Sequence, residues 1–228
     1  MFASASNLND SNIVNMIGTL YSGSIPLAWI DLGAGDGRLT KLVAASLPKG
    51  SVTDCVEVDT ACIRLLEQEG FRVSNADLNS ALPFSSESFD FVVANQVIEH
   101  LYDTDYFIGE IRRIVRPNGH IIISTENLAS WHNVGALMLG WQPFSITNYS
   151  VKKSGIGNPL ALHLGEAGAP FPMQHHRLFT TNALRELLEL HGFRIDFIAG
   201  AGYYPFPATV GKLHPNRAHF IAIGATVN

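Results

Sequence analysis

One short stretch, residues 27–39, constrains the fold of this 228-residue chain more than any other. It reads Leu-Ala-Trp-Ile-Asp-Leu-Gly-Ala-Gly-Asp-Gly-Arg-Leu. The apolar first half is typical of a buried parallel strand, and apolar residues after Gly37 recur at helical spacing. Glycines at 33, 35 and 37 permit positive φ or the close approach of another group. The stretch therefore predicts a strand, a tight turn and a helix whose free N–H groups face a polar ligand.

The spacing of these glycines distinguishes between two kinds of ligand. A dinucleotide-binding turn has the spacing G-x-G-x-x-G around a pyrophosphate. Here the spacing is G-x-G-x-G, with Asp31 before the turn and Asp36 inside it. Two carboxylates repel a pyrophosphate but attract a cation such as an α-ammonium group. The pattern Asp-x-Gly-x-Gly-x-Gly resembles the first motif of class I methyltransferases that use S-adenosylmethionine (SAM). The alternative is a glycine turn that only connects two elements.

Composition places the chain among globular proteins with a substantial core. Hydrophobic residues make up 46% and charged residues 15%, and the net charge is −5, which gives no support for nucleic-acid binding. The first ten residues lack the pattern of a signal peptide, and no apolar run is long enough for a bilayer. Cys55 and Cys62 have no partner cluster, as expected of packed thiols. We expect a cytoplasmic protein without membrane insertion.

Acidic residues end the next two predicted strands. Glu57 lies at the tip of a strand over 52–58, and Asp77 follows a third strand that begins near Gly70. In the methyltransferase family, the positions of these two acids hold the ribose hydroxyls and the adenine amine. The resemblance also implies that the N–H of Leu78 contacts the adenine ring. Asp59 is a second ribose candidate, whose alternative role is to cap a helix over 60–69.

The following strand ends in the sequence Asn-Gln-Val-Ile-Glu-His-Leu, which resembles the fourth-strand motif of the small-molecule methyltransferases. Substrates of open α/β sheets bind at the carboxyl ends of strands, so Asn95, Gln96 and His100 face the substrate region. His100 is a candidate general base, because imidazole titrates near neutrality. Its alternative role is to order the loop.

The proline–glycine turn at 116–119 and its apolar strand resemble the fifth-strand motif, except that Glu126 replaces a frequent proline.

The remaining periodic segments predict further helices and two last strands. Helices are expected at about 10–21, capped by Asp10 or Ser11, and over 106–115. A sixth strand spans 194–199, and the family places a last strand over 218–226 antiparallel between the fifth and the sixth. The predicted fold is α/β, a Rossmann-like doubly wound seven-stranded sheet, mostly parallel with the last strand antiparallel, and with helices on both faces.

Residues 128–174 interrupt this alternation with aromatic residues, glycines and prolines. A connection of this length in a compact domain is usually functional. We interpret it as a helix at about 129–140 and an irregular cap over the substrate end of the sheet; the alternative is a homodimer contact. His175 and His176 follow it. Adjacent side chains diverge in an extended segment, and no neighbouring ligand set completes a metal site, so we predict substrate contact and no metal.

The resemblance covers residues 29–227 and predicts a single methyltransferase domain over residues 1–228. It implies methyl transfer from SAM to an O-, N- or C-nucleophile of a small-molecule acceptor, with S-adenosylhomocysteine (SAH) as product. The candidate catalytic residues are His100, His175 and His176. The candidate cofactor-binding residues are Asp31, Gly33, Ala34, Gly35, Gly37, Glu57, Val58, Asp77, Leu78, Asn95 and Gln96.

Three other classes of protein remain as alternatives. A nicotinamide-dependent dehydrogenase shares the first strand, turn and helix, although its glycine spacing differs. A non-catalytic binding or regulatory protein could keep the fold, because no nucleophile or base is secure. A nucleic-acid methyltransferase is disfavoured by the acidic net charge and by the absence of an Asn-Pro-Pro-aromatic loop after the fourth strand.

Overall fold

The computed structural model describes residues 2–161 and 173–228, and within them the fold is a seven-stranded sheet with helices on both faces. The strands are β1 (Ala28–Leu32), β2 (Val52–Glu57), β3 (Arg72–Asn75), β4 (Phe89–Asn95), β5 (Val115–Glu126), β6 (Phe193–Ala201) and β7 (Phe220–Val227). Their spatial order is β3-β2-β1-β4-β5-β7-β6. β7 runs antiparallel to both β5 and β6, and the other neighbouring pairs are parallel. The predicted fold class is confirmed, including the place of the last strand.

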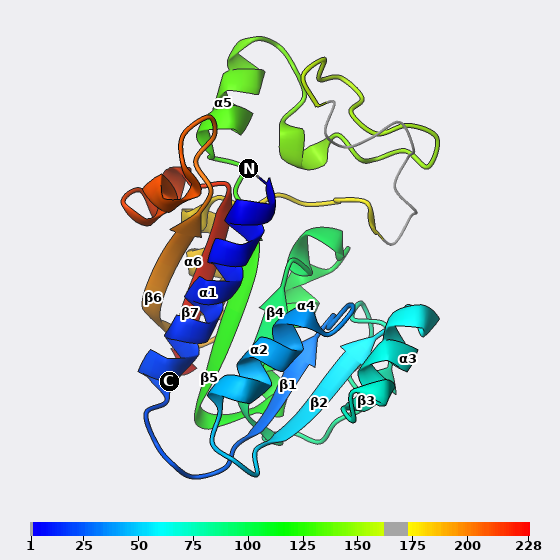
Figure 1. Ribbon diagram of the computed structural model, residues 1–228, viewed down its shortest axis with the longest axis vertical. Helices are drawn as coiled ribbons and strands as arrows, with labels where there is room; N and C mark the ends of the chain where they lie inside the picture. Colours follow the sequence, from blue (N-terminus) through cyan, green and yellow to red (C-terminus); the bar gives the residue numbers. More distant parts are fainter. Residues whose placement is uncertain (1, 162–172) are drawn as a thin grey trace.

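The helices form a layer on each side of the sheet. They are α1 (Phe2–Leu20), α2 (Arg38–Ser46), α3 (Thr60–Gln68), α4 (Thr104–Ile114), α5 (Trp131–Met138) and α6 (Thr181–Leu190), with short 3₁₀ turns η1 (Ile98–His100), η2 (Phe144–Ile146), η5 (Ala208–Lys212) and η6 (Pro215–Arg217). Figure 1 shows α1 and α2 side by side over one face of the sheet. α5 and η2 lie beyond the carboxyl ends of the parallel strands (Figure 1).

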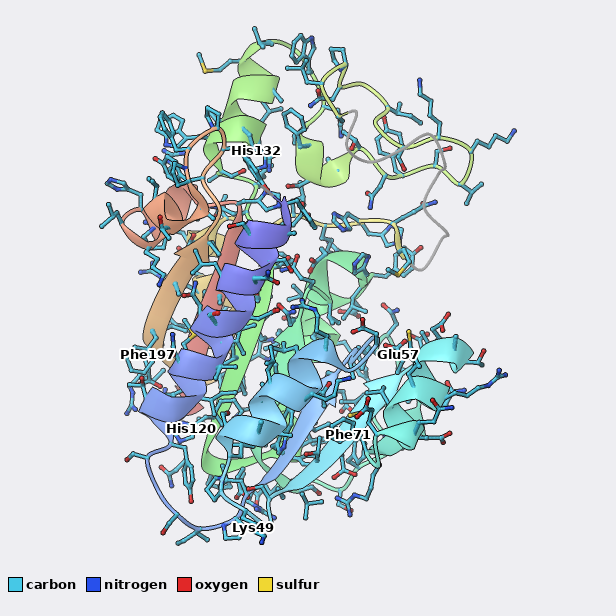
Figure 2. The ribbon with its side chains drawn as sticks, viewed as in Figure 1. Lys49, Glu57, Phe71, His120, His132 and Phe197 are labelled. Atoms are coloured by element: carbon cyan, nitrogen blue, oxygen red, sulfur yellow. The ribbon has the colours of Figure 1, made fainter. Side chains whose placement is uncertain are left out.

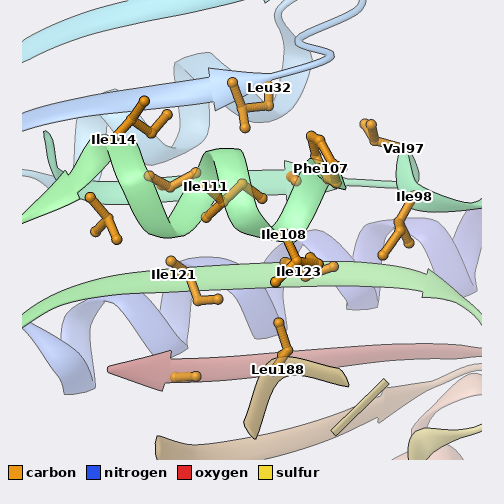
Figure 3. Packing of buried hydrophobic residues seen from close by; sticks show 14 of the residues in the cluster. Leu32, Val97, Ile98, Phe107, Ile108, Ile111, Ile114, Ile121, Ile123 and Leu188 are labelled. Carbon is orange, nitrogen blue, oxygen red and sulfur yellow. The ribbon is translucent and has the colours of Figure 1, made fainter. Parts of the chain in front are cut away.

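The two faces of the sheet bury different apolar clusters. One cluster joins α1 and α2 to Trp29, Phe91 and Ile122 of the sheet. On the opposite face, α4 and α6 pack on Ile121 and Ile123, as Figure 3 shows. These side chains are almost fully buried, and each contributes on the order of 2 kcal/mol through removal of apolar area from water. The two clusters hold the central strands in place, so their carboxyl ends form a rigid edge.

The N-terminal helix begins much earlier than the sequence pattern indicated. The expected helix at about 10–21, capped by Asp10 or Ser11, is wrong at its start, because α1 runs from Phe2 to Leu20. Asp10 therefore lies inside the helix, where it is 2% exposed and forms an ion pair with Arg38. Residues 2–9 hold only two large apolar side chains, Phe2 and Leu8, and these are not at helical spacing, so periodicity of hydrophobic residues could not detect these first two turns.

The fifth strand also differs from its prediction. A turn at 116–119 followed by a strand was expected, but β5 spans Val115–Glu126 and includes these residues. The register against β4 shifts between Phe89 and Phe91, which accommodates Asn118 at a φ of 61°. The proline and glycine therefore produce an irregularity within the strand rather than a separate turn.

The predicted cap is partly described. Its expected helix at 129–140 corresponds to α5, and η2 follows it. The side chain of Asn133 ties the two together, since it donates to Ser145 Oγ (2.9 Å) and to the carbonyl of Asn127 (3.0 Å). The part of the predicted cap over residues 162–172 lies outside the described residues.

Candidate active site

The glycine turn after β1 has the conformation that its sequence predicts. Gly33, Gly35 and Gly37 all have positive φ, at 74°, 56° and 77°. The N–H groups of Gly33 and Ala34 both donate to the carbonyl of Val56, which anchors the turn to the end of β2. A Cβ on Gly33 would lie 2.5 Å from Val97, whereas a Cβ on Gly35 would meet nothing within 4 Å. The turn is therefore tightly packed at Gly33 and has open space beside Gly35.

Glu57 closes this turn from the neighbouring strand (Figure 2). Its Oε2 accepts a hydrogen bond from the N–H of Gly35 at 2.8 Å. Its Oε1 accepts from the N–H groups of Val58 and Asp59 at 2.7 and 2.9 Å. Three backbone donors thus hold one carboxylate beside the open side of the glycine turn. Two fixed acceptor oxygens are the chemistry that a ribose with adjacent hydroxyls requires.

Asp31 lies beneath the turn, on the face of the sheet that α2 covers. Its side chain is buried, and its Oδ2 accepts a hydrogen bond from Thr40 Oγ1 at 2.7 Å. Burial raises the pKa of Asp31 to about 6, and the nearby carboxylate of Glu57 adds to the rise. A buried carboxylate of this kind gains from a cation placed beside it, because the desolvation of its charge is then compensated.

The third acid reaches the same edge of the sheet. Glu57 pairs with Asn75, the last residue of β3, and Asp77 follows two residues later. The Asp77 side chain is exposed and accepts hydrogen bonds from the backbone and side chain of Asn79. The Leu78 side chain lies within 3.7 Å of the Cβ position built on Gly33. The ends of β1, β2 and β3 are therefore adjacent, as the sequence analysis expected.

Two details distinguish the surroundings of Glu57 from those of its neighbour Asp59. Val58 is 49% exposed, so it offers an uncovered apolar surface next to the Glu57 carboxylate. Asp59 caps α3, where its Oδ1 accepts from the N–H groups of Ala61 and Cys62. The capping role predicted as its alternative is confirmed, and Glu57 is the acid that faces the turn.

The end of β4 is linked to α1 through a buried amide. Asn9 donates to Asn95 Oδ1 and to Ser124 Oγ, both at 2.9 Å. Gln96 adopts a φ of 57°, and its side chain also donates to Ser124 Oγ, at 3.2 Å. Asn95 and Gln96 are among the candidate residues predicted from the sequence, whereas Asn9 and Ser124 are not. Asn9 lies one turn before Ile13 on the same buried stripe, but a polar residue on that stripe gives no signal in the hydrophobic pattern.

Two of the three candidate histidines come together at the same edge. The rings of His100 and His175 lie 4.7 Å apart between centroids. Burial lowers the pKa of His100 to about 4 and also lowers the pKa of His175, so both are neutral near pH 7. His176 differs, because its ring stacks on Tyr102 at 4.4 Å. The predicted pair of adjacent histidines is therefore split between two environments.

The segment that holds His175 is fixed to η1 by its backbone. The N–H groups of His176 and Arg177 both donate to the carbonyl of Glu99, at 2.8 and 3.2 Å. The Arg177 side chain donates to the carbonyl of Tyr102. Glu99 itself is fully buried, and burial raises the pKa of its carboxyl to about 8. Thr125 Oγ1 donates to its Oε2 at 2.7 Å.

A second group of polar side chains extends from the end of β5 toward the cap. Glu126 Oε1 lies 3.9 Å from His219 Nε2, and Glu126 Oε2 lies 4.0 Å from His175 Nδ1. Burial raises the pKa of Glu126 to about 7. His219 and His132 are joined through their ring nitrogens at 2.9 Å. The sequence marked Glu126 only as a departure from proline, and nothing in the chain linked it to His132 or His219.

Glu99, Glu126 and the histidines around them form a polar, mostly buried group, which we call the acceptor side of this edge after its expected role. Glu57, Asp31 and the glycine turn make the other side suited to a ligand that has hydroxyls and a cationic group. Of the helices in the described part of the chain, none is both long and apolar enough to cross a membrane.

Comparison with known proteins identifies the family. The family described as "Methyltransferase domain" matches residues 11–196, most of the chain. The chain belongs to this family, and its fold is that of the class I SAM-dependent methyltransferases. Among curated relatives, the chain is 29% identical over 136 residues to a malonyl-[acyl-carrier protein] O-methyltransferase of Methylococcus capsulatus. That match covers 56% of this chain and 46% of the relative, so the chain spans about half of that relative's length.

Two solved structures show the same fold. One is a protein of Thermotoga maritima described as a possible histamine N-methyltransferase, with a TM-score of 0.65, 17% identity, and coverage of 98% of this chain and 91% of that one. The other is the 1,6-didemethyltoxoflavin-N1-methyltransferase of Burkholderia thailandensis, with its substrate and SAH bound. Its TM-score is 0.59 at 17% identity, and the match covers 94% of this chain and 76% of that one.

Proposed function

We propose that this protein is an enzyme that transfers the methyl group of SAM to a small-molecule acceptor and releases SAH. The observation that supports this most is the Glu57 carboxylate, held by three backbone N–H groups beside the open space at Gly35. Membership of the methyltransferase family agrees with it. The bound SAH in the Burkholderia relative shows that the shared fold accommodates this product.

In this proposal each part of SAM meets a different part of the edge. The ribose hydroxyls donate to the Glu57 carboxylate, and the adenine lies between Val58 and Leu78 with its amine toward Asp77. The methionine part lies against Gly33, Ala34, Gly35 and Gly37, with its ammonium group toward Asp31. Asn95 and Gln96 complete the site on the side of β4. The raised pKa of Asp31 supports its place, since a cation stabilises the ionised form.

The reaction needs little covalent chemistry from the protein. The acceptor's lone pair forms the new bond to the methyl carbon while the carbon–sulfur bond breaks, and its electrons remain on sulfur as SAH leaves. Placing the acceptor in line with that bond supplies much of the rate. A base is needed only where the acceptor atom loses a proton. His100 and His175 are placed for that role because they are neutral and lie together, whereas His176 is stacked on Tyr102.

We further propose one domain over residues 1–228, with 128–174 as a cap over the acceptor. The hydrogen bonds of Asn133 to Ser145 and Asn127 support this, because they fix α5 and η2 above the end of β5. The exposed apolar side chains of Leu137, Met138 and Leu139 on the far end of the cap are the surface that a homodimer contact would use. The acceptor is a small molecule rather than a nucleic acid, in keeping with the acidic net charge.

Cofactor binding separates this proposal from the dehydrogenase alternative. We expect titration calorimetry to show one equivalent of SAM or SAH bound and no heat with NADH. Binding of NADH in place of SAM would overturn the assignment. Release of labelled SAH from labelled SAM in the presence of a panel of hydroxy, amino and carboxy acids would then separate an enzyme from a non-catalytic binding protein.

A further inference from the structure

Three side chains on the acceptor side lie together in the way that ligands of a metal ion do. One donor atom each from Glu99, His100 and His175 lies within 4.8 Å of the other two. Ligands at about 2.0–2.2 Å from a metal lie roughly 3–4 Å apart, so a small contraction brings all three into coordination. Glu99 and His100 belong to η1 and lie far from His175 in the sequence, so the residues neighbouring His175 in the chain could not indicate this cluster.

The hydrogen bonds of the two histidines prepare one nitrogen of each ring for a ligand. His100 Nδ1 lies 3.1 Å from the carbonyl of Gln174, and His175 Nδ1 contacts the carbonyl of Ser145. A carbonyl oxygen only accepts, so each Nδ1 must carry the proton, which leaves the lone pair on Nε2. This arrangement, in which the far nitrogen donates to a backbone carbonyl, is the usual support of metal-binding histidines.

Glu99 provides an independent observation that points to a ligand. Its side chain is 0% exposed, and its Oε1 has no hydrogen-bond partner among the residues that the structure describes. The other oxygen accepts from Thr125, which orients the carboxylate. A buried oxygen without a partner costs free energy unless something else binds it. Glu126 lies 4.0 Å from His175 and adds a second acidic group nearby.

We propose that Glu99, His100 and His175 bind a divalent transition-metal ion. Two imidazoles and one carboxylate favour zinc, iron, cobalt or nickel, whereas magnesium and calcium prefer oxygen donors alone. Three protein ligands leave at least one coordination position open, as in catalytic rather than structural zinc sites. The site lies after β4, at the same edge of the sheet as Glu57.

The position of the ion predicts the class of acceptor, and this step rests on the proposed function. An acceptor with a hydroxyl or carboxylate oxygen can occupy the open position and be held next to the methyl group. A metal-bound hydroxyl loses its proton more readily, so the ion takes over the task of a base. His100 and His175 then act as ligands rather than as bases. Metal binding itself requires neither SAM nor an acceptor.

Cobalt(II) titration of tag-free protein, stripped with EDTA and dialysed, tests the proposal. We expect visible absorption bands that saturate at one equivalent and that zinc abolishes by competition, while the same concentration of magnesium does not. Glu99→Gln keeps the shape of the side chain, and His175→Gln lies outside helix and strand. Each removes a ligand, so each should weaken cobalt binding by more than the roughly 10- to 100-fold that loss of an outer-shell partner costs. His214→Gln, at an exposed histidine near η6, should leave it unchanged.

The proposal is overturned if the wild-type protein shows no saturable bands, or if His175→Gln binds cobalt as tightly as His214→Gln. Equal competition by magnesium would also contradict it. Thermal melting of the metal-free proteins checks that each variant is folded. If Glu99→Gln melts at a lower temperature than the wild-type protein, the cobalt titration of His175→Gln alone tests the proposal. SAH calorimetry on the stripped wild-type protein keeps the two proposals apart, since loss of SAH binding counts against the proposed function, and loss of cobalt binding counts against the metal site.

Discussion

The cofactor side and the acceptor side of the sheet edge are built in different ways. On the cofactor side, Asp31, Glu57 and Asp77 each belong to or directly follow their own strand, and three neighbouring parallel strands bring them together. On the acceptor side, Glu99 and His175 come from segments far apart in the chain, and backbone hydrogen bonds join them. The first side depends on strand register, and the second depends on how irregular segments pack.

This difference explains which amino-acid substitutions each side tolerates. The cofactor side contains tight backbone turns, so added atoms have no room at Gly33. The acceptor side contains longer side chains with several polar neighbours, and the cap above it has open positions such as Gly135, where a Cβ would meet nothing within 4 Å. Variation in the acceptor site can therefore change specificity without disturbing the cofactor turn.

The largest expected effect is on stability and lies at Gly33. Gly33→Ala adds a Cβ at a φ of 74° and at 2.5 Å from Val97, so strain and overpacking should lower the free energy of unfolding by about 2–4 kcal/mol. Gly135→Ala in α5 is the matched control, and it should stabilise the protein by up to about 1 kcal/mol. Urea unfolding of both variants measures this. Equal costs at the two positions would contradict the contrast between the two sides.

The next largest effect is on cofactor affinity and lies at Gly35, in the same turn. Gly35→Ala meets no atom within 4 Å, so its cost to folding is limited to about 1 kcal/mol for the positive φ. SAM lies against this position in our proposal, so its affinity should fall at least about 10-fold, or 1.4 kcal/mol. Calorimetry with SAH and a thermal melt test both parts. Unchanged SAH affinity in a folded Gly35→Ala protein would place the cofactor elsewhere.

Acidity should weaken cofactor binding through Asp31. With a pKa of about 6 in the folded protein, this group is mostly protonated at pH 5, so SAM affinity should be about 10-fold weaker at pH 5 than at pH 7. Because the pKa of Asp31 is raised from 3.8 to about 6, protonation of Asp31 also stabilises the ligand-free folded protein. This contribution to the free energy of unfolding is fully present below pH 3.8 and is lost as the pH rises through 6. The Asp31→Asn variant should bind SAM weakly at both pH 5 and pH 7, with no such change in affinity between them. A flat wild-type profile argues against pairing of Asp31 with the ammonium group.

The smallest effect tests whether the two sides are independent. His175→Gln should change SAH affinity by less than about twofold, because contacts far apart contribute additively. The same variant is expected to lose the metal. Calorimetry with SAH on this variant gives the comparison, and a large loss of affinity would show that the two sides are coupled.

The sequence predicts the cofactor side of the edge better than the acceptor side. The glycine turn and the places of Glu57 and Asp77 at strand ends could be predicted because each signal is contained in one short stretch, whereas the antiparallel direction of β7 was expected only from the family resemblance. Asn9 was missed because its helix begins in a polar segment that hydrophobic periodicity does not detect. The meeting of His100 and His175 was only suspected, and Glu99 was not singled out, because their partners lie more than 70 positions away.

The central claim is that Glu57 and Asp77 bind one adenosyl group from adjacent strands. Titration calorimetry with SAH on wild type, Glu57→Ala and Asp77→Ala tests it most directly. Charge-assisted hydrogen bonds contribute about 1.5–3 kcal/mol each, so we expect SAH affinity to fall roughly 10- to 150-fold in each variant. Asp77→Ala should melt near the wild-type temperature, whereas Glu57→Ala, which also loses three backbone hydrogen bonds, should melt lower. Wild-type affinity for SAH in both variants would contradict the account.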